Sequence, residues 1–284
     1  QDHIGKDSSR GNQRERQESM TQQTKIAIIG VGAMGGSIAK GLLRSGNISP
    51  TNLWLANPHK EKLAVFQQQG AHVVTDNCEA VAQAEVIILC VKPWLADQVL
   101  EQIKPVMDHD RHTLVSVVAG MSGQHICEQM ESNGSSPQTL LCLPNTAASV
   151  GQSMTFLVPV NASDSQTQAI ANIFEEMGRV MITEERCLPA GMALASCGIA
   201  YAMRYARAAT EGGVELGIKA HDALQVVLQT MAGAAALLQE SGSNPEQEID
   251  KVTTPGGFTI KGLNEMEHAG FTSAVIRGLK ASVK

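Results

Sequence analysis

The chain has 284 residues, a length that fits one large or two modest domains. Its formal net charge is −6 at pH 7 and no cluster of Lys and Arg is visible, so a nucleic-acid partner is not expected. The longest nearly uncharged stretch, about residues 188–203, is short for a bilayer span, so a membrane protein is not expected either.

The amino-terminal segment differs in composition from the rest of the chain. From Gln1 to Ser19 the only aliphatic residue is Ile4, so this segment cannot form a core, and it lacks the apolar centre of a secretory signal. We expect residues 1–20 to be a disordered extension or one added to the natural sequence, because Met20 resembles a natural start. The six cysteines never form a C-x-x-C pair, which favours buried free thiols and a cytoplasmic location.

Apolar runs alternating with helical patterns follow this segment. Residues 25–29 are predicted to be a strand, continuously apolar from Ile26 onwards as is typical of a buried parallel strand. A glycine-rich turn follows, and then a helix that Gly46 and Asn47 end. Further strands are predicted at 53–56, 72–74, 86–91, 114–118, 140–143, 154–158 and 179–182, and helices at 58–69 and 165–177. This alternation predicts an α/β fold with a Rossmann-type, doubly wound parallel sheet.

The pattern changes after Thr183. Residues 188–238 and 259–284 are predicted to be helical, with the last segment broken near Gly270. We therefore divide the chain into the extension 1–20, a dinucleotide-binding Rossmann domain at 21–184, and an all-helical dimerisation and substrate domain at 185–284. A helical half so rich in small residues, with little polar surface, predicts a subunit interface.

The turn Gly30-Val31-Gly32-Ala33-Met34-Gly35 follows a predicted strand and opens a predicted helix, the setting in which G-x-G-x-x-G binds a dinucleotide. The first glycine makes the tight turn and the second lets the backbone approach the pyrophosphate. The third lets helix and strand pack closely, and the helix amino terminus faces the phosphates. The alternative is a glycine-rich turn without a ligand.

The residues after the second predicted strand indicate which cofactor binds. An NAD site usually has Asp or Glu there for the ribose 2′-hydroxyl, whereas this chain has Asn57-Pro58-His59-Lys60 and no acid before Glu61. Asn57, His59 and Lys60 could bind a 2′-phosphate, so we predict NADP(H) as the preferred cofactor and NAD(H) as the alternative. The plainer interpretation is that Lys60 is a solvated residue in the first turn of a helix.

Ligands of such sheets bind at the carboxyl ends of the strands. Three polar or glycine-containing strand ends therefore predict a cleft: Val91-Lys92-Pro93, Ala119-Gly120 and Pro144-Asn145-Thr146. Each of them could also be ordinary turn chemistry.

Taken together, these motifs resemble the pyrroline-5-carboxylate reductase family. The matches run in the family's order from about Lys25 onwards: the turn at 30–35, then 91–93, 116–121, 143–147, 198–201, and Thr254-Pro255-Gly256-Gly257-Phe258-Thr259. The Pro-Gly-Gly-x-Thr element is the most specific of these, because general Rossmann dehydrogenases lack it. The resemblance implies NAD(P)H-dependent reduction of the cyclic imine 1-pyrroline-5-carboxylate to L-proline. It also implies a helical domain that interlocks with a second subunit, in a homodimer or a ring of dimers.

The resemblance also assigns site residues, and no metal is among them. The substrate would contact Gly256, Gly257, Phe258 and Thr259, helped by Glu184. Glycine amides at a helix start suit a carboxylate, and Thr259 would be the catalytic residue that bonds the ring nitrogen and relays a proton. The plainer interpretation is a simple helix start with Thr259 as its cap. The cofactor would contact Val31, Gly32, Ala33, Met34, Asn57, Asn77, Cys90, Val91, Lys92, Pro93, Val118, Ala119 and Gly120.

Some positions depart from the family pattern. Ile199 replaces a proline and follows Cys197, Phe258 replaces a small residue, and Lys251 replaces a neutral polar residue expected near the cofactor. Alternatives are therefore a related NADP-dependent imine or β-hydroxyacid oxidoreductase, or a non-catalytic dinucleotide-binding protein. A β-hydroxyacid dehydrogenase needs a catalytic lysine, for which Lys219 in a predicted turn is poorly suited. The intact element at 255–259 disfavours a protein without catalysis.

Overall fold

The computed structural model describes residues 21–283, so the predicted extension at 1–20 lies outside the described residues. The chain divides into two compact units, the first ending at Gly191 and the second beginning at Met192. The division predicted from the sequence falls earlier and differs in residues 185–191.

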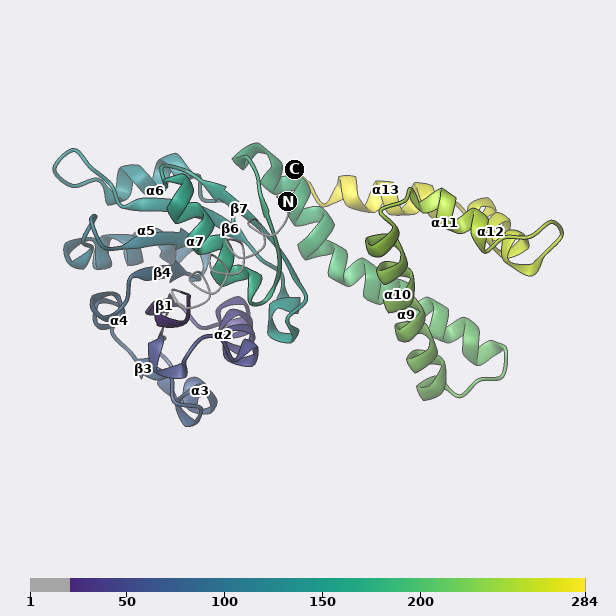
Figure 1. Cartoon of the computed structure of the whole chain (residues 1–284), viewed down its shortest axis with the longest axis horizontal. Coiled ribbons are helices and arrows are strands. Elements are labelled where there is room, and N and C mark those ends of the chain that lie inside the picture. Colours follow the sequence, from purple (N-terminus) through teal and green to yellow (C-terminus); the bar gives the residue numbers. More distant parts are fainter. Residues whose placement is uncertain (1–20, 284) are drawn as a thin grey trace, which may run out of the picture. The chain divides into compact units, whose positions relative to one another are not determined.

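The first unit is built on one eight-stranded sheet with strand order β3-β2-β1-β4-β5-β6-β7-β8 (Figure 1). The prediction of a Rossmann-type, doubly wound sheet is confirmed. The strands are β1 Ile26–Ile29, β2 Leu53–Ala56, β3 His72–Val74, β4 Val86–Leu89, β5 Thr113–Ser116, β6 Gln138–Leu143, β7 Ser153–Pro159 and β8 Gly178–Ile182.

The sheet is not parallel throughout, which corrects the prediction at its far edge. Strands β1 to β6 run parallel, but β7 pairs antiparallel with β6, and β8 runs parallel to β7. Residues 144–152 between β6 and β7 hold only the short 3-10 helix η4, Thr146–Val150, and a left-handed Gly151. A parallel return needs a crossover of a dozen or more residues, usually a helix, so this short connection reverses the chain.

Helices cover both faces of the sheet. On one face lie α2 Ala33–Ser45, α3 Ala64–Gln68 and α7 Asp164–Glu175, and on the other α4 Asn77–Gln83, α5 Pro93–Ile103 and α6 Gly123–Met130. Alternate residues of β1 serve the two layers, since Ile28 joins the first core and Ile29 the second. This two-sided burial explains why the strand sequence is continuously apolar. The helix predicted at 58–69 is a 3-10 turn, η2 Lys60–Leu63, that leads into α3.

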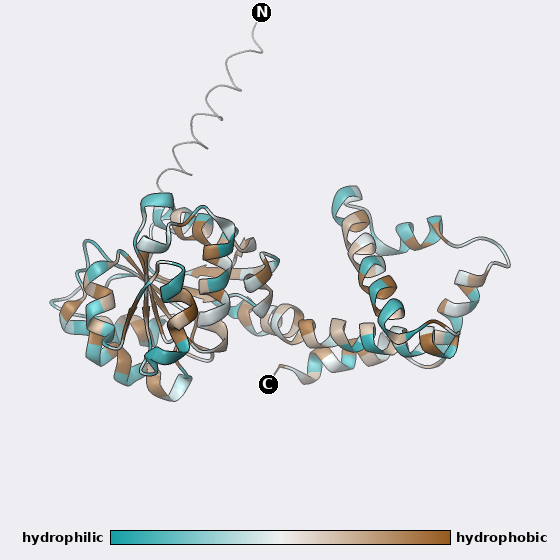
Figure 2. Ribbon diagram, turned by 90° about the horizontal axis from the view of Figure 1, so that it is seen from below, coloured by the Kyte–Doolittle hydropathy of each residue, from teal (hydrophilic) through white to brown (hydrophobic). Residues whose placement is uncertain are grey.

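The second unit is helical, as predicted, and Figure 2 shows apolar and polar residues alternating along its helices. Gly270, with φ of 86°, separates the last two helices near the predicted break. Its elements are the π-helix η6 Met192–Cys197 and the α-helices α9 Gly198–Glu215, α10 Ala220–Ser241, α11 Pro245–Lys251, α12 Phe258–His268 and α13 Phe271–Ala281. Within residues 21–283, no helix has both the length and the apolar character needed to cross a membrane.

His112, immediately before β5, gives the first unit a pH-dependent stability. Its side chain is 2% exposed, and its Nδ1 accepts the Asp108 backbone N–H at 2.9 Å. Burial and the nearby Arg111 guanidinium lower the pKa of His112 below its usual value. As the pH falls, His112 therefore takes up a proton more readily in the unfolded chain than in the folded chain. The resulting stabilisation is complete above about pH 6.5 and is lost as the pH falls from there through the lowered pKa.

We expect His112→Asn to flatten this pH dependence. The Asn carbonyl can still accept the Asp108 N–H but does not titrate, so the difference in Tm between pH 7.5 and pH 5.5 should shrink relative to the unmodified protein. Thermal unfolding at both pH values measures it. His109→Asn is the control, because His109 is only partly buried and bonds Ser135. An unchanged difference in Tm for His112→Asn would contradict the assignment.

Candidate dinucleotide and substrate sites

The glycine-rich turn joins β1 to α2 at the carboxyl edge of the sheet. Gly30 has φ of 88° and its N–H donates to the Ala56 carbonyl of β2 at 2.9 Å. Gly32 is the N-cap of α2 and supplies no side-chain cap, and the first turn of α2 holds no acidic residue. The helix therefore presents its first amide groups and positive dipole end without a competing side chain, an arrangement that suits phosphate.

The three motif glycines differ in the space around them. A Cβ on Gly35 would lie 2.2 Å from the Gly30 carbonyl oxygen, so only glycine lets α2 pack this closely on the turn. A Cβ on Gly32 would meet no atom within 4 Å. The protein's own packing therefore does not require glycine at position 32. The open space beside Gly32 instead fits the close approach of a pyrophosphate.

The predicted 2′-phosphate residues lie together after β2. The Asn57 backbone N–H donates to the Val74 carbonyl at 3.1 Å, and its side-chain amide donates to the His59 carbonyl at 3.3 Å. Pro58, His59 and Lys60 are exposed. Glu61 lies beside the His59 ring, with 3.5 Å between Oε1 and Nδ1, and so partly offsets the local positive charge.

Other predicted cofactor residues follow β3 and β4 at the same edge. Asn77 begins α4, and its side-chain amide donates to Gln102 Oε1 of α5 at 2.9 Å. The Cys90 backbone N–H donates to the Ile29 carbonyl at 2.8 Å, which holds the residues after β4 against the turn. Burial raises the pKa of the Cys90 thiol to about 12, so it is protonated and not nucleophilic. Lys92 is the N-cap of α5, and Pro93 is its first residue.

A cavity of about 360 Å³ opens at the ends of β4 and β5. It brings together four predicted cofactor residues, Pro93, Val118, Ala119 and Gly120. Its remaining lining residues, Met121, Ser122 and His125, were not predicted from the sequence as site residues. The signal that could have found them is the helix start that follows β5, because Ser122 caps α6 and accepts the His125 N–H at 3.2 Å.

The two adjacent acids at the start of η5, Glu185–Cys187, have different partners: Glu184 is its N-cap and Glu185 its first residue. The Glu184 carboxylate, which the resemblance assigns to the substrate, accepts a hydrogen bond from the Arg186 guanidinium, and both side chains are exposed. Glu185, which the sequence analysis did not single out, accepts the Gly123 N–H at the start of α6, at 3.1 Å.

The Pro-Gly-Gly element leads directly into α12. Gly256 is left-handed, with φ of 70°, and Gly257 is the N-cap of α12 and has no side-chain cap. Phe258 and Thr259 are the first two residues of the helix, and both side chains are exposed. Since Gly257 holds the N-cap position, Thr259 is not the cap that the plainer interpretation required.

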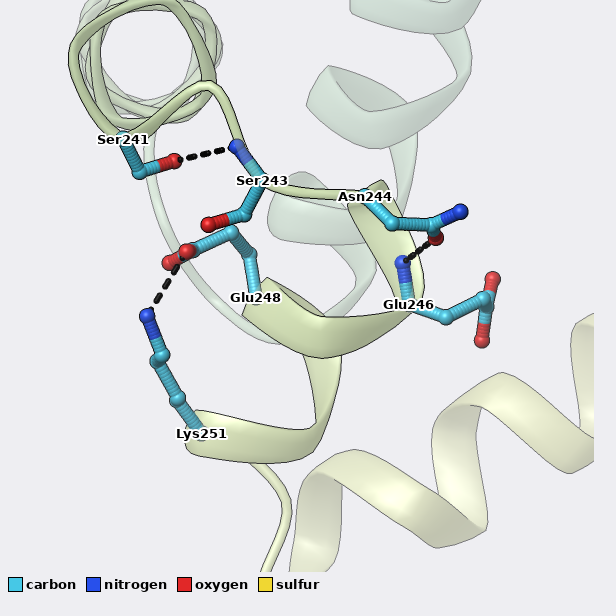
Figure 3. A network of polar contacts seen from close by, with 6 residues as sticks. All are labelled: Ser241, Ser243, Asn244, Glu246, Glu248 and Lys251. Carbon is cyan, nitrogen blue, oxygen red and sulfur yellow. Dashed lines mark hydrogen bonds and ion pairs between the residues drawn. The ribbon is translucent and has the colours of Figure 1, made fainter.

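A polar network precedes this element, at the turn between α10 and α11 (Figure 3). Asn244 caps α11 by accepting the Glu246 N–H at 2.9 Å, and Lys251 Nζ lies 2.7 Å from Glu248 Oε1. The hydrogen bond from Lys251 is the main cause that lowers the pKa of Glu248. Lys251, the charged residue that departs from the family pattern, thus has a partner within its own helix.

The departures at Cys197 and Ile199 fall at the junction of two helical forms. Cys197 ends the π-helix η6, and Gly198 and Ile199 begin α9. Tyr201 of α9 and Ser282, which follows α13, are joined by a hydrogen bond between their hydroxyl groups. This bond ties the start of α9 to the carboxyl-terminal end of the chain within the second unit.

Comparison with known proteins identifies the family. The chain is 38% identical over 270 residues to pyrroline-5-carboxylate reductase 1 of Dictyostelium discoideum, covering 90% of this chain but only 48%, about half, of that longer protein. It is 36% identical to pyrroline-5-carboxylate reductase 2 of the same organism, with 91% of each chain covered. The chain belongs to the pyrroline-5-carboxylate reductase family. Two family models agree: residues 185–284 match pyrroline-5-carboxylate reductase dimerisation, and residues 25–120 match NADP oxidoreductase coenzyme F420-dependent.

Solved pyrroline-5-carboxylate reductases share the fold. The NADP-bound enzyme of Plasmodium falciparum is 25% identical, with a TM-score of 0.81 and coverage of 92% of this chain and 96% of that one. The enzyme of Coxiella burnetii is 26% identical, with a TM-score of 0.82 and coverage of 91% and 96%.

The dimerisation match explains the surface of the second unit. Among its described residues only three alanines, Ala193, Ala206 and Ala223, are buried in the isolated chain. An apolar hollow of about 430 Å³ lies on α9 and α10, and large side chains such as Met203 and Leu228 that line it are exposed. A unit that buries so little by itself needs another surface to cover it, and self-association of this family member provides one.

Proposed function

We propose that this chain is a pyrroline-5-carboxylate reductase, which reduces 1-pyrroline-5-carboxylate to L-proline with NAD(P)H in the last step of proline biosynthesis. The observation that carries the proposal is the Pro-Gly-Gly element at the start of α12. It presents Gly256 with open space around it and an exposed Thr259, in a chain whose other unit has an edge that fits a dinucleotide.

The residues of the first unit fit a dinucleotide. The turn at 30–35 would hold the pyrophosphate, and the residues after β2 would hold the adenosine end. NADP(H) is the proposed preferred cofactor, because Asn57, His59 and Lys60 carry no negative charge, and NAD(H) is the alternative. A similar enzyme, that of Plasmodium falciparum, has been solved with NADP bound. Asn77, Cys90, Val91, Lys92, Pro93, Val118, Ala119 and Gly120 complete the proposed cofactor contacts.

Reduction of the imine requires mainly that the protein bind and orient the substrate. When bound, the reduced dinucleotide supplies the hydride. The substrate is a cyclic imine that carries a carboxylate. The Phe258 amide at the α12 amino terminus would bind the carboxylate beside Gly256 and Gly257, since the Gly257 N–H already donates to the Thr254 carbonyl at 2.9 Å. The Thr259 hydroxyl would hydrogen-bond the ring nitrogen and hold its proton in place, and Glu184 is the proposed additional substrate residue. Fixing the ring in one orientation lowers the barrier without a strong acid or base.

A coupled absorbance measurement tests the function. The purified protein, NADPH and 1-pyrroline-5-carboxylate should give a substrate-dependent loss of absorbance at 340 nm, with L-proline as the product. NADH and related cyclic imines, run in parallel, define the cofactor and substrate ranges. No substrate-dependent loss with either nucleotide would refute the proposal. The alternative of a β-hydroxyacid dehydrogenase gains no support, because Lys219 is the exposed N-cap residue of α10 and follows the left-handed Gly217.

Asn57→Asp should shift the cofactor preference from NADPH towards NADH. A carboxylate after β2 repels a 2′-phosphate and can accept a hydrogen bond from the ribose hydroxyl. We expect the ratio of kcat/KM for NADPH to that for NADH to fall by about tenfold or more, which corresponds to roughly 1.4 kcal/mol. Asn52→Asp makes the same change of charge at the amino end of the same strand and is the control. An unchanged ratio for Asn57→Asp would remove the argument for NADP(H).

We further propose a homodimer or a ring of dimers in the cytoplasm, acting on a small molecule without nucleic acid or membrane as a partner. The six free cysteines, with Cys142 fully within the core, suit a reducing compartment. Light scattering of the purified protein at several concentrations measures the oligomer size.

A further inference from the structure

The cavity at the ends of β4 and β5 contains polar groups with no assigned role. Its walls come from two helix starts, Pro93 of α5 and Ser122 and His125 of α6, and residues 118–121 form its base. All of these residues belong to the first unit. With a volume of about 360 Å³, the cavity is large enough for one flat heteroaromatic ring with its sugar.

The His125 imidazole is fixed at one nitrogen by an acid from the neighbouring helix. Nε2 lies 2.7 Å from Asp97 Oδ1, one turn into α5. An ionised carboxylate can only accept a hydrogen bond, so Nε2 carries the hydrogen, and in the neutral ring Nδ1 is an acceptor. None of the hydrogen bonds among the described residues uses Nδ1, and the side chain is 41% exposed at the cavity wall.

Two amide groups at the start of α6 have partners already. Gly123 N–H donates to Glu185 Oε1 at 3.1 Å, and His125 N–H donates to Ser122 Oγ at 3.2 Å. The first turn of α6 is therefore not an open anion site, since a carboxylate occupies it. A ligand in the cavity instead contacts the His125 ring. The acceptor there is Nδ1, so the ligand must supply an N–H or O–H donor.

The place of the cavity along the sheet edge indicates which ligand group reaches it. The residues after β2 come first, then the turn at 30–35 after β1. Cys90 comes next, and it lies against the turn, because its carbonyl oxygen would be 2.9 Å from a Cβ placed on Gly30. The cavity follows, at the ends of β4 and β5. An extended dinucleotide with its adenosine end after β2 and its pyrophosphate at the turn therefore directs its other half to the cavity.

From these observations we infer that His125, held by Asp97, binds the nicotinamide riboside half of the dinucleotide. Its Nδ1 accepts a hydrogen bond from the ribose hydroxyl or the carboxamide N–H. Asp97 is a positioning residue, which sets the tautomer and the direction of the ring. The inference rests on the proposed dinucleotide site, but it does not require that the imine be the substrate.

Calorimetric titration of the full chain with two nucleotides tests the assignment. His125→Phe keeps a ring of similar size without the acceptor, and should weaken NADPH binding about five- to tenfold, the usual effect of one lost hydrogen bond. Binding of 2′,5′-ADP, which lacks the nicotinamide half, should not change. His125→Asn retains an acceptor near the Nδ1 position and should bind NADPH within about twofold of the unmodified protein. His109→Phe is the control, and Asp97→Ala should weaken NADPH alone without altering the cavity lining.

Equal weakening of NADPH and 2′,5′-ADP, or NADPH binding unchanged in both His125→Phe and Asp97→Ala, would overturn the inference. The 3-acetylpyridine analogue of NADPH, which has no carboxamide N–H, distinguishes the two donors. If His125→Phe leaves binding of the analogue unchanged, the contact is to the carboxamide, and if it weakens the analogue by the same factor, the contact is to the ribose. The expected binding pattern without any reduction of 1-pyrroline-5-carboxylate would refute the proposed function and leave the His125 assignment standing.

Discussion

Gly35→Ala is expected to cause the largest loss of stability of any single methyl addition in the dinucleotide turn. The added Cβ would lie 2.2 Å from the Gly30 carbonyl oxygen and 3.4 Å from Cys90 Cβ, so α2 must move away from the strands. Overpacking of this kind costs about 1–3 kcal/mol. In a domain of this size we expect Tm to fall by roughly 2–12 °C. Because the shift displaces the start of α2, NADPH affinity should fall as well.

Gly32→Ala separates binding from stability. A Cβ there meets no atom of the protein within 4 Å and the backbone φ is −85°, so alanine fits the fold. It would stand where the pyrophosphate must approach, so we expect NADPH affinity to fall at least about tenfold with little change in Tm. Thermal unfolding and NADPH titration of both variants measure these effects. An unchanged Tm for Gly35→Ala, or an equal loss of Tm for Gly32→Ala, would contradict the roles of the two glycines.

Much of the first unit could be predicted because its signals are local. Buried parallel strands are continuously apolar, and glycine marks many of the places where the backbone turns sharply or packs closely. The direction of β7 could not be read in the same way, since an apolar run is the same in either direction. The direction of β7 follows from the short connection at 144–152, which is too short for a parallel crossover. This argument can be made only when β6 and β7 are known to be neighbours in the sheet.

In the first unit, the residues around the cavity were predictable only where a strand end marks them. The residues at 118–120 follow β5 directly, whereas His125 and Asp97 lie on two different helices and are 28 positions apart in the sequence. Their pairing depends on the packing of α5 against α6, which no sequence pattern reports. The partners of the adjacent acids Glu184 and Glu185 could not be predicted from the sequence either. The backbone turn into η5 places Glu185, and not Glu184, against the start of α6.

Thr259→Ala is expected to have the largest effect on turnover. If the Thr259 hydroxyl bonds the ring nitrogen, its loss removes the group that orients the imine and holds its proton, and kcat should fall about 100-fold. NADPH affinity should not change, because the proposed cofactor residues lie in the first unit. Steady-state kinetics with 1-pyrroline-5-carboxylate, combined with NADPH titration, separates the two quantities.

The position of Thr259 makes this result interpretable. Its side chain is exposed and the N-cap of α12 is Gly257, so alanine removes no cap and should leave Tm nearly unchanged. Thr259→Ser keeps the hydroxyl and should retain most of the turnover. Thr272→Ala, on α13, removes a hydroxyl bonded to Glu267 and is the control. Parallel losses of turnover and NADPH binding in Thr259→Ala would show that the residue supports the fold and does not act on the substrate. Full activity of Thr259→Ala would show that Thr259 is not catalytic, and would favour the interpretation of Pro255-Gly256-Gly257 as a simple helix start.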